Sequence, residues 1–127
     1  FVCREVRVIG VHLRELPTPD RVAQIADFLL THEGMRWSIV TGRYDGKLHV
    51  SLRTHSPSED AGRLLKRMLG GGNRGGGHRS IAGGSVVVGG DATEEKWRDA
   101  EEGVVASFLK TRNSGESEST YPFRNSI

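Results

Sequence analysis

Ten consecutive residues near the middle of the chain combine backbone freedom with side chains that bind anions. They run from Gly75 to Gly84 and read GGGHRSIAGG, within a stretch (70–90) that holds ten of the seventeen glycines. Glycine costs folding entropy, so a dense cluster indicates turns with positive φ or a backbone that approaches a ligand closely. Because His78, Arg79 and Ser80 follow the glycines directly, the segment is typical of a loop that holds a phosphate.

Arg53 is a second candidate for phosphate binding, at the end of a predicted strand over residues 47–53. Side chains alternate along a strand, so Arg53 shares a polar face with Ser51, opposite an apolar face. Its planar fork of donors matches phosphate, and ligands of α/β sheets tend to bind where strands end at their carboxyl side. The alternative interpretation is a surface ion pair with Asp45 or Glu59, which contributes only about 0–1 kcal/mol.

Other chemistries find little support in the residue spacing. The five histidines, at positions 12, 32, 49, 55 and 78, form no i,i+2 or i,i+4 pair that would indicate a metal site. The glycine run lacks the Gly-Lys-Ser/Thr ending of a nucleotide-hydrolysing P-loop. Cys3, the single cysteine, has no recognisable base partner. We therefore predict no catalytic residue and no metal ligand within this chain.

Alternating strand and helix patterns position these residues. Periodicity predicts strands over 6–13, 35–41, 47–53 and 85–88, and helices from Pro19 to about 33, from 58 to 69 and from 93 to 110. Thr18 and Asp91 are candidate helix caps, Asp45-Gly46 predicts a hairpin turn, and residues 78–82 are expected to form a short helical turn. The pattern predicts an α/β or α+β domain with a mixed sheet of four to five strands flanked by helices, and a Gly-rich loop before the last strand.

Length and composition fit one globular domain. The chain has 127 residues, and no apolar run approaches the roughly 18 that span a bilayer. A lone cysteine favours a reducing, cytoplasmic location. Because the chain begins at Phe1 and reaches a strand pattern almost at once, we expect it to be part of a longer protein.

Positive charge coincides with the glycine-rich region. Residues 36–90 contain nine basic and three acidic side chains, a local charge of +6, whereas the whole chain has +2. This is the distribution expected of a surface that attracts a polyanion, although solvated helix and strand faces give the same pattern.

The segments Gly75-Gly76-Gly77-His78 and Ser51-Leu52-Arg53, separated by a helix, resemble the GGGH and Ser-x-Arg elements of the DHHA1 domain. The resemblance extends from about Arg21 to Val88. DHHA1 domains form the C-terminal half of DHH-type phosphoesterases, among them RecJ-like exonucleases and enzymes that hydrolyse short oligoribonucleotides, cyclic-dinucleotide products or 3′-phosphoadenosine 5′-phosphate. The resemblance implies that residues 1–112 are a substrate-binding domain. Residues 113–127 lack hydrophobic periodicity, so we expect a flexible tail there.

The same resemblance implies the partners and the site. An N-terminal DHH domain, absent from this chain, would hold two divalent metals, usually manganese, so this chain alone would be inactive. Substrate phosphate, on a short oligonucleotide or a nucleotide phosphate, would contact Arg53 and His78, with Ser51 and Arg79 nearby. Gly75, Gly76 and Gly77 would allow close approach, and a homodimer is a further possibility.

Two features depart from the family pattern, and two other functions stay open. No Asp-His-His motif occurs in the chain, and Gly70 to Arg74 lengthen the approach to GGGH. One alternative is a stand-alone module for single-stranded nucleic acid, which the low aromatic content of 6% disfavours. The other is a dimerisation or interaction domain of the alanyl-tRNA synthetase type.

Overall fold

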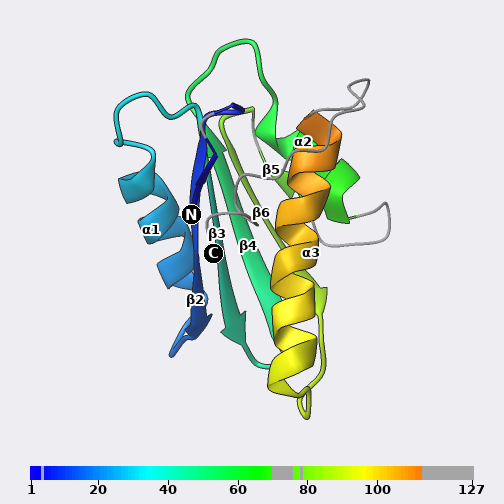
Figure 1. Cartoon of the computed structure of the whole chain (residues 1–127). Coiled ribbons are helices and arrows are strands. Elements are labelled where there is room, and N and C mark those ends of the chain that lie inside the picture. The colour runs from blue at the N-terminus through cyan, green and yellow to red at the C-terminus, as the bar shows by residue number, and fades with distance from the viewer. Residues whose placement is uncertain (4, 70–75, 78, 113–127) are drawn as a thin grey trace.

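A mixed sheet with helices on both faces forms the domain (Figure 1). The computed structural model describes residues 1–3, 5–69, 76–77 and 79–112. Within them the sheet order is β1-β2-β3-β4-β6-β5; β2 and β3 are parallel, and all other neighbours are antiparallel. In chain order the elements are β1 (Val2–Cys3), β2 (Val8–Glu15), α1 (Asp20–Leu29), β3 (Trp37–Tyr44), β4 (Lys47–Thr54), α2 (Ala61–Leu69), β5 (Gly76–Gly77), β6 (Ile81–Val87) and α3 (Glu94–Arg112).

The fold class predicted from the sequence is confirmed, with a sheet somewhat wider than expected. Four long strands, β2, β3, β4 and β6, form its body, and the two-residue strands β1 and β5 extend its edges. The predicted hairpin turn is also present, because Asp45 (φ 53°) and Gly46 (φ 73°) both adopt the positive φ that a tight two-residue turn requires. This turn sets the β3–β4 register, in which Ser38 pairs with Arg53.

The two faces of the sheet have separate cores. The larger core lies under α2 and α3 and includes Trp37, Leu52 and Phe108. The smaller core lies under α1, where Val22 and Ala26 pack on Val40. Because α1 packs on β2, β3 and β4, and β6 has no such cover, Ile81 and Val87 stay 42% and 75% exposed. One face of β6 is therefore open.

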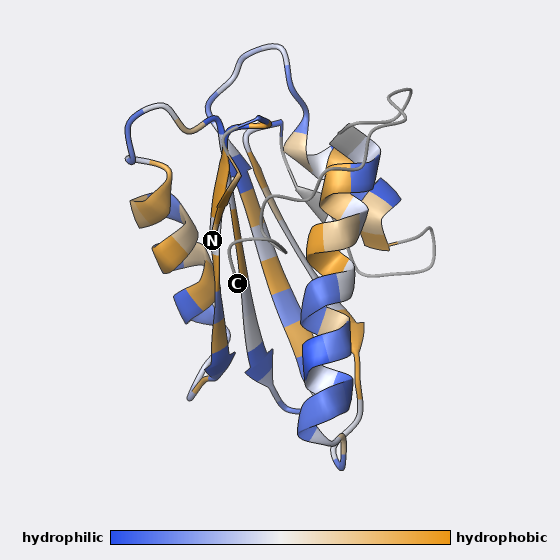
Figure 2. Ribbon diagram, in the orientation of Figure 1, coloured by the Kyte–Doolittle hydropathy of each residue, from blue (hydrophilic) through white to orange (hydrophobic). Residues whose placement is uncertain are grey.

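An ionic cluster attaches α3 to the sheet. Arg43 of β3 is 5% exposed and donates to Glu101 at 2.8 Å and to Glu94 at 2.8 Å, with its guanidinium 5.4 Å from the Trp97 ring. The hydrogen bonds to Glu101 and Glu94 raise the pKa of Arg43, and Arg43 lowers the pKa of Glu94 to about 2. Along α3, the first half, which carries Glu94 and Glu101, is mostly hydrophilic, and the C-terminal half beside α2 is more apolar (Figure 2).

Several local predictions were wrong. The expected helical turn over 78–82 is not formed at its end, because β6 begins at Ile81 and pairs there with Arg53 of β4. The cap of α1 is Pro19, without a side-chain hydrogen bond, and α3 is capped by the Thr93 hydroxyl, which accepts from Lys96 N–H at 3.2 Å. The hydrogen bonds between β4 and β6 outweigh the local helical propensity of residues 78–82. At α3, the Thr93 hydroxyl lies closer to the first helical turn than Asp91 does. No helix among the described residues is long and apolar enough to cross a membrane.

Candidate functional site

Arg53 is a buried arginine with an unsatisfied donor. The residue is only 8% exposed, and its Nη1 forms an ion pair with Asp27 of α1 at 2.8 Å. Its Nε is buried and has no hydrogen-bond partner among the described residues. A buried polar N–H without a partner costs about 1–3 kcal/mol, so native structures rarely keep one unless a ligand or water completes it.

The partner of Arg53 differs from the one considered in the sequence. Asp45 and Glu59 were the candidates, but the carboxylate at 2.8 Å belongs to Asp27, on the helix that crosses over β3 and β4. No spacing in the sequence indicates this contact, because the tilt of α1 across the sheet decides which strand Asp27 reaches. The ion pair leaves Asp27 itself 65% exposed, so the acidic side of the pair faces solvent.

Pairing across three strands brings the glycines to the polar residues of β4. Gly83 of β6 pairs with Ser51 on one side and with Gly76 of β5 on the other, while Gly77 pairs with Ala82. With strands about 4.8 Å apart, Gly76 lies roughly 10 Å from Ser51 in the same row. Ser51, Arg53, Gly76 and Gly77 therefore share one region of the sheet.

Gly83 leaves open space beside Ser51. A Cβ added at Gly83 would meet only the backbone oxygen of Val50, at 3.8 Å, and Gly83 has no positive φ. Neither packing with described neighbours nor backbone conformation accounts for glycine at this position. By contrast, a Cβ at Gly10 would overlap the Ile39 oxygen and the Phe1 ring. The open space at Gly83 is available for a ligand that approaches the strand.

The remaining candidates lie partly elsewhere. Arg79 is exposed, and its Nη2 donates to the backbone oxygen of Pro57 at 3.1 Å, in the connection between β4 and α2. His49, on the polar face of β4 with Ser51, has its pKa lowered, chiefly by burial and then by Lys47. Gly75 and His78 lie outside the described residues, as do the 70–74 loop and the predicted tail over 113–127.

A comparison with known families decides the classification. The model of the DHHA1 domain matches residues 5–111. The chain belongs to the DHHA1 domain family. The resemblance noted in the GGGH and Ser-x-Arg elements is thereby confirmed, and it extends well beyond the segment that suggested it.

One curated relative of this DHHA1 domain is much longer than the chain. An uncharacterized protein of Methanocaldococcus jannaschii is 31% identical over 78 residues, which are 61% of this chain and 16% of that protein. The matched part of the chain thus spans only 16% of the length of this curated relative.

Two solved structures share the fold. An exopolyphosphatase-related protein from Bacteroides fragilis superposes with a TM-score of 0.58 at 15% identity, over 88% of this chain and 32% of that one. The C-Ala domain of Aquifex aeolicus alanyl-tRNA synthetase gives 0.54 at 16% identity, over 76% and 89%. At these identities the similarity concerns the fold, which phosphoesterase-related and synthetase-derived domains have in common.

Proposed function

We propose that this DHHA1 domain binds a phosphate of the substrate for a DHH-type metal-dependent phosphoesterase, which acts on short oligonucleotides or nucleotide phosphates. The observation behind this proposal is the buried Nε of Arg53, which has no hydrogen-bond partner among the described residues. The open strand position at Gly83 lies on the neighbouring strand, two residues from the Arg53 partner Ile81. Family membership and the fold shared with an exopolyphosphatase-related protein support phosphate chemistry.

The buried environment of Arg53 favours anion binding more than the environment of an arginine on the exposed surface does. A guanidinium shielded from water interacts more strongly with a phosphate than an exposed one, because the local dielectric is lower. Asp27 orients the group through Nη1, which leaves Nε to donate to a phosphate oxygen. The Ser51 hydroxyl lies on the same strand face, and the family resemblance adds His78, Gly75, Gly76 and Gly77 to this site.

Metal chemistry belongs, in this proposal, to a different domain. Among the described residues, no three His, Cys, Asp or Glu side chains are grouped so that they could hold a metal ion. We therefore assign manganese binding and the activation of water to a DHH domain of the whole protein. The role of this chain is to bind the substrate and orient its phosphate.

An NMR titration with a 5′-phosphorylated diribonucleotide tests the proposal. We expect shifts centred on Ser51, Arg53 and the glycines of β5 and β6, and an Arg53→Gln variant that binds about tenfold more weakly or worse, because a hydrogen bond to a charged group contributes about 1.5–3 kcal/mol. Arg21→Gln removes an exposed arginine from the start of α1 and should leave the affinity unchanged.

A second control separates binding from structure. Asp27→Asn removes the same ion pair as Arg53→Gln but keeps the guanidinium, so it should retain nucleotide binding. If Arg53→Gln binds the diribonucleotide as well as the wild type does, the proposed site is wrong.

A further inference from the structure

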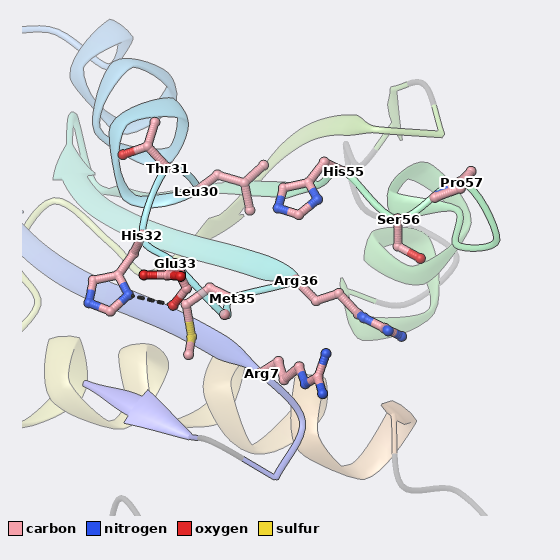
Figure 3. Close-up of a pocket in the computed structure, with 11 residues that line it drawn as sticks. Arg7, Leu30, Thr31, His32, Glu33, Met35, Arg36, His55, Ser56 and Pro57 are labelled. Carbon is pink, nitrogen blue, oxygen red and sulfur yellow. Dashed lines mark hydrogen bonds between the residues drawn. The ribbon is translucent and has the colours of Figure 1, made fainter.

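A cavity of about 490 Å³ lies at the end of the sheet where β4 finishes (Figure 3). Its walls come from three connections: Arg7 between β1 and β2, residues 30–36 between α1 and β3, and residues 55–57 between β4 and α2. Arg53 precedes this last wall by two residues, which is about 7 Å along an extended chain. The volume is in the range of pockets that hold nucleotide-sized ligands.

The cavity contains cations that nothing in the described chain neutralises. Arg7 and Arg36 are exposed and make no side-chain hydrogen bond and no ion pair with described residues. Figure 3 shows the Arg7 and Arg36 side chains extending in the same direction from neighbouring segments. The one carboxylate in the lining, Glu33, forms no ion pair with either.

Backbone hydrogen bonds join the segments that carry these cations. The Arg7 oxygen accepts from Arg36 N–H at 2.7 Å and from Trp37 N–H at 3.0 Å. The Arg36 oxygen in turn accepts from the Thr54 hydroxyl at 2.8 Å, and that hydroxyl accepts from Ser56 N–H at 3.2 Å. One chain of hydrogen bonds thus joins all three walls and fixes the backbone positions from which Arg7 and Arg36 extend.

Two further donors lie at or beside the wall formed by residues 55–57. Arg79 donates to the Pro57 oxygen at 3.1 Å, which brings a third guanidinium to the wall formed by residues 55–57. His55 lines the cavity as an additional donor without a partner among the described residues.

We infer that this cavity binds a second phosphate of the substrate, through Arg7 and Arg36. The inference rests on the proposed function, since it takes Arg53 to hold the first phosphate. It specifies the substrate class: an oligonucleotide with several phosphates in series, rather than a nucleotide with a single phosphate. Arg7 and Arg36 then select for chain length, because a mononucleotide has one phosphate and, in this proposal, Arg53 binds it.

The test compares a 5′-phosphorylated tetra-adenylate, adenosine 5′-monophosphate and inorganic phosphate on the 127-residue chain. In Arg7→Gln/Arg36→Gln, the affinity for the tetranucleotide should fall about tenfold or more, and its salt slope by about 0.7 for one lost phosphate contact. The affinity for the monophosphate should not change. Arg21→Gln/Lys110→Gln, two exposed cations of α1 and α3, is the control with matched net charge.

The outcomes separate the two proposals. If the tetranucleotide binds equally to the Arg7/Arg36 variant and to its control, or if only inorganic phosphate shifts Arg36, the second site is wrong. If Arg53→Gln leaves the affinity for both nucleotides unchanged, the first site is wrong instead. The Arg7 and Arg36 side chains are exposed, and with described residues both form hydrogen bonds only through their backbone atoms. Glutamine at these positions should therefore keep the local structure, and NMR spectra of the backbone amides check this.

Discussion

At the scale of single residues, two buried arginines of neighbouring strands have different surroundings. Arg43 donates to two carboxylates and stacks on Trp97, so its charge is compensated within the domain. Arg53 has one carboxylate partner on the exposed side of α1, and its Nε has no hydrogen-bond partner in the part of the chain that the structure describes. The same side chain thus attaches a helix in one place and, in our proposal, binds substrate in the other.

Arg43→Met should destabilise the domain by about 3–5 kcal/mol, because it leaves the buried carboxylate of Glu101 without its partner. Urea unfolding measures the change. The double variant Arg43→Met/Glu101→Met should recover much of the loss, since both buried charges are then removed. A single variant as stable as the wild type would show that the pair contributes little, and nucleotide affinity should be unchanged in every form that stays folded.

At the scale of elements, the site depends on β6 and β5 lying beside β4. The glycines of these strands leave the sheet open next to Ser51, and the register Ser51–Gly83–Gly76 sets which backbone a ligand meets. Gly10 of β2, by contrast, has a structural reason, because the Phe1 ring and the backbone and side chain of Ile39 fill the space over it.

Substituting these two glycines separates function from packing. Gly83→Ala should leave stability unchanged or raise it by about 0.5–1 kcal/mol, since it meets only one atom at 3.8 Å, yet weaken binding of the diribonucleotide. Gly10→Ala should cost about 1–3 kcal/mol through overpacking, without a direct effect on the site. Thermal unfolding and the NMR titration measure the two effects; normal nucleotide binding by Gly83→Ala would contradict the proposed approach of the ligand.

At the scale of the whole molecule, in our proposal this chain binds the phosphate and a DHH domain cleaves it. The described residues offer cations and open strands but no group of metal-ligating side chains. The chain also covers only a minor part of the curated relative that it matches. Under this proposal we expect binding without turnover from this chain alone.

With manganese added, the 127-residue chain should release no more mononucleotide from a 5′-phosphorylated diribonucleotide than buffer does. Chromatographic separation of substrate and product is the measurement, with Arg53→Gln as a control for contaminating nucleases. Manganese-dependent hydrolysis that disappears in Arg53→Gln would show that the chain is itself catalytic. Hydrolysis that persists in the variant would come from another protein.

The sequence by itself determined the three helices that the structure describes, the presence of its four long strands, the Asp45-Gly46 turn and the family, because hydrophobic periodicity, turn chemistry and the GGGH and Ser-x-Arg elements are local signals. It did not indicate the two-residue strands β1 and β5. The tertiary structure alone decided that β6 starts at Ile81, that Asp27 pairs with Arg53, and that Arg7 and Arg36 share a cavity. These contacts join residues far apart in the chain. They follow from sheet register and the tilt of α1 across the strands, and neither leaves a pattern in neighbouring residues.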